Sequence, residues 1–404
     1  MTSPAATEPT EPSRASAPTE PSRAGAPTEP SRAHDDAVDP AVERARELAW
    51  TSYLRVAAIV GVVLIHVAGL SFVREGLEGT TARALGGALA YGSRWAVIVF
   101  VMVSGALLLT PPADPDPGRF FRRRLGKVGI PLVVWHAAYI PLSAARWDFT
   151  PRELLANLLE GRSYTALYFF WLIIGLYALT PLLWPLVSAL TTRALGVAGA
   201  ALAAVPALDV VLRGLVAVLR DEPRVLHEPT LVTQFVPYVG YFLLGCALRS
   251  VVLRGARLVA LAGLLAGLLA QMVWQALAVE AAGDAAESAA TGVLSVLLPL
   301  SYQGAVVGLS AVAVFLLARG LVHPGSTWAA PSRAARTRRL GDLTFGVFAV
   351  HLLVFWAVAQ VPGLDVEEGA TTAPGVVLLS GMVVVVSFGV AWLLSRTPVL
   401  RRAV

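Results

Sequence analysis

Two ionisable side chains, Arg55 and His66, interrupt an apolar stretch that runs from Tyr53 to Val73. At about 21 residues, this stretch is long enough to cross a bilayer as a helix. With about 100° of turn per residue, both side chains lie on one helix face, roughly 16 Å apart along its axis. A charge near the centre of a membrane helix costs ~2.5–3.5 kcal/mol on insertion scales. This face is therefore predicted to line a polar interior.

Each of these residues also has a simpler interpretation. Arg55 lies only a few residues inside the stretch, so its side chain can extend to the membrane surface. His66 can form a structural hydrogen bond between helices. Their common face argues against both interpretations, because two unrelated structural residues have no reason to share a stripe.

The densest basic cluster comprises Arg122, Arg123, Arg124 and Lys127, and it lies just before an apolar run. One interpretation is that it sets membrane orientation and contacts anionic lipid. The other is a cytoplasmic phosphate site, because the guanidinium fork matches phosphate oxygens. Arg124 and Lys127 are three residues apart and would share a helix face.

Four further residues are candidates for a pocket: Ser104, Tyr168, Trp171 and His351. Ser104 precedes a glycine, a pair that lets a helix or a ligand approach closely, although helix packing alone accounts for it. The two aromatic residues are also typical of the membrane interface. No two histidines stand four residues apart, and the histidines in apolar runs, His66, His136 and His351, have no carboxylate within a turn, so no metal site is predicted.

The composition is that of a membrane protein that crosses the bilayer many times. The chain has 404 residues, of which 56% are hydrophobic and 15% charged, and its mean hydropathy is +0.66. The net charge of +5 comes mostly from arginines in short segments between apolar runs. Basic residues in such segments set orientation, so nucleic-acid binding is not expected. The single cysteine, Cys246, excludes an intramolecular disulfide.

The hydropathy pattern predicts an all-α polytopic protein with about ten transmembrane helices. The spans are expected near 50–73, 89–110, 128–145, 166–190, 194–213, 232–252, 256–279, 291–321, 341–361 and 374–395. The eighth run is longer than a bilayer requires and must tilt, break or extend beyond it. With the N-terminus in the cytoplasm, the inner segments carry about twice as many basic residues as the outer ones. This asymmetry predicts a plasma-membrane protein with both termini in the cytoplasm.

The first 47 residues form a low-complexity tail. The hexapeptide T-E-P-S-R-A begins at Thr10, Thr19 and Thr28. Its units are rich in proline and lack apolar bulk, which predicts a disordered tail. The predicted organisation is a tail over 1–47, a transmembrane domain over 48–396 and a short cytoplasmic tail over 397–404. A scaffold or sensor function would depend on the N-terminal tail alone.

Six short motifs follow one another in a recognisable order. They are R-x10-H in the first span, F-V-M-V-S-G-A-L-L-L, F-x-R-R-R before I-P-L-V-V-W, I-I-G-L-Y-x-L-T-P-L-L, Y-F-L-L-G, and L-G-x-x-T-F-G-V-F-x-V-H. Together they make residues 50–395 resemble the integral-membrane acyltransferase family three. Members of that family O-acetylate bacterial surface and exported glycans. The chain resembles the stand-alone form, without an appended soluble domain.

The resemblance implies an O-acetyltransferase of the bacterial cell envelope. Acetyl-CoA, or another acyl-CoA, would be the cytoplasmic co-substrate, and no bound cofactor is expected. The acceptor would be a hydroxyl of a carbohydrate or a lipid-linked glycan. The family's essential residues correspond to Arg55 and His66, and its donor-binding cluster corresponds to the segment from Arg122 to Lys127.

The chain departs from the family pattern at three places. Where relatives have H-L-W-F-L-Y, residues 166–171 read A-L-Y-F-F-W, so the histidine is missing and the first tryptophan is Tyr168. The family's usual tyrosine near the last histidine is Phe348, and Lys127 stands where many relatives have arginine. These departures concern the acceptor more than the fold.

One mechanism is consistent with the residues and with the resemblance. His66 would act as a general base on the acceptor hydroxyl or as a transient acyl carrier, because an imidazole exchanges protons near neutral pH. Arg55 would bind a phosphate or carbonyl oxygen of the donor and offset developing negative charge. The alternative is a transporter or flippase of glycan or lipid that uses the same polar helix face.

Overall fold

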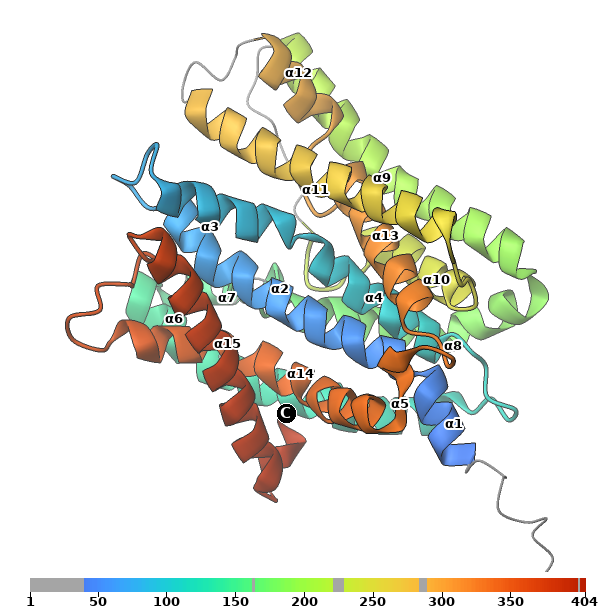
Figure 1. Ribbon diagram of the computed structural model, residues 1–404. Coiled ribbons are helices and arrows are strands. Elements are labelled where there is room, and N and C mark those ends of the chain that lie inside the picture. The colour runs from blue at the N-terminus through green and yellow to red at the C-terminus, as the bar shows by residue number, and fades with distance from the viewer. Residues whose placement is uncertain (1–39, 162–163, 221–228, 283–288, 399) are drawn as a thin grey trace, which may run out of the picture. The chain divides into compact units, whose positions relative to one another are not determined.

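The regular elements of this chain are helices throughout the part that the computed structural model describes. That part comprises residues 40–161, 164–220, 229–282, 289–398 and 400–404. The predicted disordered tail up to residue 39 lies outside it. The α-helices in chain order are α1 Pro40–Glu47, α2 Ala49–Val73, α3 Thr81–Gly92, α4 Trp95–Leu108, α5 Pro117–Arg124, α6 Ile130–Trp147, α7 Pro151–Leu159, α8 Tyr168–Ala189, α9 Thr192–Arg220, α10 Val239–Leu248, α11 Ala256–Ala282, α12 Ala289–Leu297, α13 Ala305–Leu321, α14 Pro331–Ala359 and α15 Ala373–Arg396 (Figure 1).

The helices confirm the predicted fold class. Within the described residues, eight helical segments are long and apolar enough to cross a membrane. Two shorter apolar helical segments, Val236–Leu248 and Ala305–Leu321, stand at the predicted sixth and eighth spans. The protein is therefore an all-α polytopic membrane protein. Which side each terminus faces stays a prediction.

The basic cluster, which lies before the third predicted span, is helical. The Asp116 carboxylate accepts from the Arg119 amide at 2.9 Å and caps α5, whose first residue is Pro117. Asp at the N-cap and Pro at the first helical position both favour helix initiation. A π-helical segment, η1 (Leu125–Gly129), then joins α5 to α6 without a break. The third predicted span therefore begins earlier than expected and includes the cluster.

Two apolar runs break within what the sequence pattern presents as one span. The candidate span Thr81–Leu108 divides into α3 and α4 at Ser93 and Arg94. The long eighth run divides into α12 and α13 at residues 298–304. A side chain at Gly304 would overlap the carbonyl oxygen of Pro299, so the second break requires glycine there. The expectation that this run tilts, breaks or extends is met by a break.

Helix α2 occupies the centre of the packing. It contacts α3, α4, α14 and α15, and Figure 1 shows it between α4 and α14. Its side chains Leu54, Ile59, Val63 and Val67 are at most 2% exposed. The residues that carry the candidate chemistry on α2 are therefore held against neighbouring helices.

Helices α4 and α10 approach each other at a pair of glycines. A Cβ atom on Gly105 would overlap the Phe242 carbonyl oxygen, and one on Gly245 would overlap the Met102 carbonyl oxygen. Small residues let membrane helices approach to backbone contact, where van der Waals packing replaces the absent hydrophobic drive. The packing interpretation of Gly105 is thus confirmed.

Both ends of the membrane domain pack on it. Residues 40–47, expected as the end of the tail, form α1, and Arg46 of α1 donates to the Pro324 carbonyl at 2.5 Å. At the other end, the short helix η5 (Leu400–Arg402) leads to Ala403, whose carbonyl accepts from the Trp135 indole at 2.7 Å. The segment expected as a C-terminal tail is therefore attached to α6.

Replacing Gly105 with alanine should destabilise the protein. The added methyl meets backbone atoms, which cannot move aside as a flexible side chain can, so overpacking should cost about 1–3 kcal/mol. Thermal unfolding of the purified protein in detergent measures the loss. The control is Gly267→Ala on α11, where a Cβ meets nothing within 4 Å; there alanine should stabilise the helix by up to ~1 kcal/mol. Equal melting temperatures for the two variants would contradict the close-contact interpretation.

Candidate functional site

Helices α2 and α14 bring two histidines together inside the bundle. The ring centroids of His66 and His351 lie 5.4 Å apart, with the ring planes at 39°. His351 is fully buried, and its Nδ1 lies 2.7 Å from the Phe348 carbonyl oxygen. A carbonyl only accepts, so this nitrogen carries the proton and Nε2 has the lone pair. Among the described residues, Nε2 has no hydrogen-bond partner. It is therefore an unused acceptor beside His66.

His66 borders a small closed cavity, here called the His66 chamber. Its volume is about 10 Å³, which is room for about one water molecule. The chamber is lined by Val62, Ile65, His66, Val97, Phe100, Ala166, Tyr168, Phe169, Tyr302 and Phe348. Because the lining is almost entirely apolar and aromatic, a reacting group that enters it is separated from bulk water, and the electrostatic interactions of the imidazole become stronger.

A larger cavity, here called the aromatic cavity, adjoins this chamber. The two share Tyr168 and Tyr302 in their linings. The volume of the aromatic cavity is about 500 Å³, within the range of small-molecule sites. Its lining is Trp147, Phe149, Asn157, Tyr164, Thr165, Tyr168, Pro229, Gln234, Tyr238, Tyr302 and Gln303. None of these side chains carries a formal charge, and they offer aromatic faces together with amide and hydroxyl groups.

Arg55 lies on the same helix as His66 but has its own partners. Its Nη2 is 3.8 Å from the Asp342 carboxylate on α14 and 3.4 Å from the Ser52 hydroxyl. Asp342 lies inside α14, which begins at Pro331. The Arg55 Nε is buried and has no partner among the described residues. The guanidinium is thus held in place with one donor unused.

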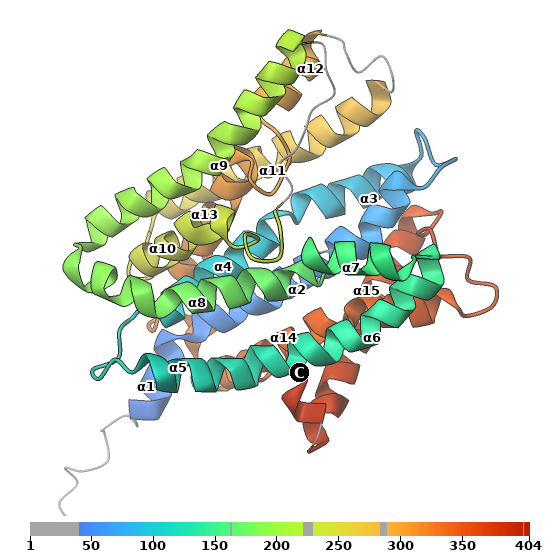
Figure 2. The ribbon, with the colours of Figure 1, turned by 180° about the vertical axis from the view of Figure 1, so that it is seen from behind.

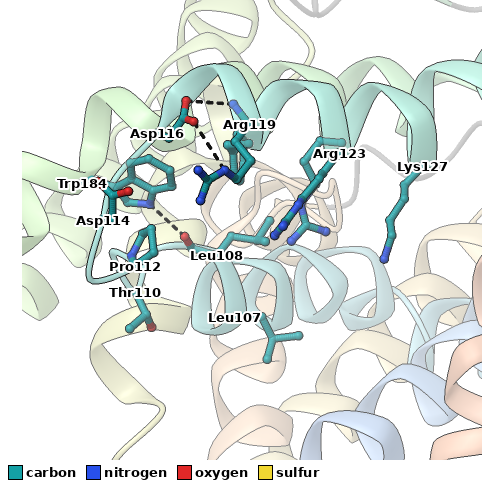
Figure 3. Close-up of a pocket in the computed structure, with 12 residues that line it drawn as sticks. Leu107, Leu108, Thr110, Pro112, Asp114, Asp116, Arg119, Arg123, Lys127 and Trp184 are labelled. Carbon is teal, nitrogen blue, oxygen red and sulfur yellow. Dashed lines mark hydrogen bonds and ion pairs between the residues drawn. The ribbon is translucent and has the colours of Figure 1, made fainter.

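The basic cluster lines a third cavity, here called the basic cavity, of about 430 Å³. Arg124 and Lys127, which were predicted to share a helix face, line it together with Arg123, whereas Arg122 does not. Figure 3 shows Arg119, Arg123 and Lys127 extending from the α5–α6 helix toward the side of the cavity where Leu107 and Leu108 lie on α4. Arg119 is a member that the sequence analysis did not single out.

Two acidic residues, Asp114 and Asp116, also line the basic cavity, which still has an excess of positive charge. The backbone amide of Arg119 donates to the Asp116 carboxylate and holds its pKa below the usual range. Arg124 lies over aromatic rings, with its Cζ 5.6 Å from the Phe120 centroid and 5.5 Å from that of Tyr177. Cation–π contacts of this kind orient a guanidinium and leave its edge free for an anion.

The basic cavity and the His66 chamber lie toward opposite ends of α4. Leu107 and Leu108 line the former, while Val97 and Phe100 line the latter. At 1.5 Å per residue, the separation along α4 is roughly 10 Å between Phe100 and Leu107 and roughly 16 Å between Val97 and Leu108. A ligand that occupies both cavities must therefore have a long flexible portion.

Ser104 and Trp171 were expected to line a pocket, but they line none of the three cavities. The Ser104 hydroxyl donates to the Phe100 carbonyl within α4 at 2.9 Å. The Trp171 indole donates to His136 Nε2 at 3.1 Å, so His136 has its proton on Nδ1, 2.8 Å from the Leu132 carbonyl. The role of Trp171 in the structure is therefore an interhelical hydrogen bond between α6 and α8.

The hydroxyl of Tyr139 forms hydrogen bonds with the backbone of α14 next to His351. It donates to the Ala349 carbonyl at 2.9 Å and accepts from the Leu353 amide at 3.3 Å. These two backbone groups would otherwise pair only with each other in a regular helix. Tyr139, on α6, thus ties α6 to α14 at the level of the histidine pair; Figure 2 shows α6 crossing in front of α14. Nothing in the sequence around Tyr139 indicated this contact.

The described residues contain no group of three or more His, Cys, Asp or Glu side chains that could hold a metal ion. The chemistry available to this site from its own side chains is that of the imidazole pair, the Arg55 guanidinium and the tyrosine hydroxyls. A paired imidazole removes or returns a proton, and a guanidinium stabilises developing negative charge.

Comparison with known families gives one match. Residues 48–396, nearly the whole of the described chain, match the sequence model of acyltransferase family 3, described as an acyltransferase domain. No curated protein and no solved structure matches the chain.

The basic cavity should bind polyphosphate. Charge-assisted hydrogen bonds contribute about 1.5–3 kcal/mol each, so Arg123→Gln combined with Lys127→Gln should weaken binding of inorganic pyrophosphate at least tenfold. Calorimetry on the purified protein at fixed salt measures the affinity. Arg122→Gln is the matched control, because it removes an exposed charge from outside the cavity lining and should change affinity less than threefold. Equal losses in both variants would mean that only the general positive field matters.

Proposed function

Because the chain belongs to acyltransferase family 3, we propose that this membrane acyltransferase moves an acyl group, most simply acetyl, from acyl-CoA to a hydroxyl of a carbohydrate or lipid-linked glycan. The observation that carries the proposal is the His66–His351 pair, which lies beside the aromatic cavity and at the far end of α4 from the basic cavity. Family membership favours this function over a transporter or flippase.

The charge of the acyl-CoA donor is opposite to that of the basic cavity, and the length of its arm matches the distance between the basic cavity and the His66 chamber. CoA carries phosphate groups at one end and a thioester at the end of a long flexible arm. Arg119, Arg123, Arg124 and Lys127 provide the cationic groups that phosphates require. A separation of roughly 10–16 Å along α4 suits an arm whose phosphates remain in the basic cavity while the thioester reaches the His66 chamber.

The acceptor fits the aromatic cavity. Neutral rings stack on the C–H faces of sugars, and amides such as Asn157, Gln234 and Gln303 hydrogen-bond to hydroxyls. A sugar bound there lies next to the His66 chamber, because Tyr168 and Tyr302 line both cavities. An uncharged lining also suits a neutral sugar better than an acidic one.

The reaction uses the histidine pair to move one proton. His66 takes the proton of the acceptor hydroxyl, whose oxygen attacks the thioester carbonyl carbon. The tetrahedral intermediate then collapses, the carbon–sulfur bond breaks, and the CoA thiolate receives the proton from His66. The free Nε2 of His351 can accept a hydrogen bond from the His66 ring and so hold that ring in its proton-accepting tautomer. Arg55, fixed by Asp342, stabilises negative charge on the donor.

His66→Ala should abolish transfer of labelled acetyl from acetyl-CoA to membrane glycan or lipid. General-base catalysis typically accelerates a reaction 10²–10⁴-fold, so the transfer rate of the variant should be at least 10²-fold lower than that of the wild type. The measurement uses membranes that express each variant at equal levels. His323→Ala is the control, because His323 lies between α13 and α14 and lines none of the three cavities. Wild-type activity in the His66 variant would refute the mechanism.

A further inference from the structure

The two helix breaks of the bundle meet at one arginine. Arg94 stands at the break between α3 and α4, and its guanidinium Nη1 donates to the carbonyl of Leu300 in the break between α12 and α13. Non-helical backbone at membrane depth is tolerated only where protein or an internal cavity satisfies it. The two breaks are therefore structurally coupled, since one supplies the hydrogen bond that the other lacks.

Arg94 is itself held in a defined position. Its Cζ lies 4.0 Å from the ring centroid of Tyr91 and 5.7 Å from that of Tyr302. The non-helical segment 298–304 has a second side-chain contact at its start, where Gln275 donates to the Leu298 carbonyl at 3.1 Å. Two backbone carbonyls of the segment are therefore hydrogen-bonded by side chains of other helical segments.

The segment 298–304 places Tyr302 at the boundary between two cavities. Tyr302 lines the His66 chamber and the aromatic cavity, and it shares this property with Tyr168. Neither hydroxyl has a hydrogen-bond partner among the residues that the structure describes. A half-buried phenol without an internal partner, at the boundary between two cavities, is available to a ligand that passes from one to the other.

We propose that Tyr302 binds the acceptor at the entrance to the His66 chamber and that Arg94 is the positioning residue that holds Tyr302 there. The proposal rests on the proposed function for the identity of the acceptor, but the clamp between Arg94 and residues 298–304 does not. Tyr302 determines which hydroxyl of the acceptor reaches His66, because it is one of the two residues, with Tyr168, that line both the aromatic cavity and the His66 chamber.

The clamp is tested without any assay of activity. In a Cys246→Ala background, Tyr302→Cys places the chain's only thiol on the segment. The rate at which a small maleimide labels it in membranes should rise at least fivefold when Arg94→Gln is added. Arg94→Lys, which keeps a donor for the Leu300 carbonyl, should restore a rate near the starting one.

The control for this labelling experiment is Arg74→Gln. Arg74 also donates to the backbone of a distant segment, at 2.6 Å to the Gly369 carbonyl, but it lines none of the three cavities. Its loss should leave the labelling rate within twofold. Unchanged labelling after Arg94→Gln, or an equal rise after Arg74→Gln, would overturn the positioning role.

The acceptor role is tested by kinetics in active membranes, with an alkyl glucoside as acceptor and labelled acetyl-CoA as donor. Tyr302→Phe should raise the acceptor KM about tenfold, as loss of one hydrogen bond does, and leave the donor KM within twofold. Arg94→Gln should shift the acceptor KM in the same direction. A rise in the donor KM alone would overturn the role of Tyr302. Absence of transfer by the wild type would refute the acceptor role together with the proposed function, while the labelling result would still decide the clamp.

Discussion

Every polar group inside this apolar bundle needs a partner, because lipid offers none and an unsatisfied group costs several kcal/mol. The arrangement of the site follows from how these needs are met. Tyr139 bonds to the backbone of α14, and Trp171 bonds to His136. His351 satisfies one ring nitrogen on its own helix. Nε2 of His351 is one of the buried side-chain atoms left without a partner among the described residues, and it lies beside His66. This nitrogen is thus a polar atom that structure does not use and that chemistry can use.

The helix breaks meet the same requirement on a larger scale. A continuous helix satisfies its own backbone and presents only side chains, whereas a break exposes carbonyl and amide groups. Here the carbonyl of Leu300 takes its hydrogen bond from Arg94, and that of Leu298 takes one from Gln275. The non-helical segment 298–304, which these contacts hold at its start, brings Tyr302 and Gln303 to the lining of the aromatic cavity. Breaks of this kind place ligand groups near the middle of a membrane protein.

Much of the fold could be predicted from local patterns. Apolar runs located the spans, and Pro299 with Gly304 accounts for the division of the longest one. The basic cluster and the common face of Arg124 and Lys127 could be predicted, but the hydropathy of the third span starts only at residue 128, whereas the Asp116 cap starts the helix at Pro117. For the site, the face shared by Arg55 and His66 followed from helix periodicity. Arg94 and Tyr302 were missed because neither residue is unusual in its own segment.

The sequence by itself determined which segments are helices, which family the chain resembles and where its ionisable groups lie along each helix, because hydropathy, helix period and motifs are local properties. Only the tertiary structure decided that His351 faces His66, that Asp342 pairs with Arg55 and that Arg94 reaches the carbonyl of Leu300. Lipid solvates every apolar helix face equally well, so hydropathy does not determine which helices pack together. Close approach at small residues such as Gly105 and hydrogen bonds across helices make that choice.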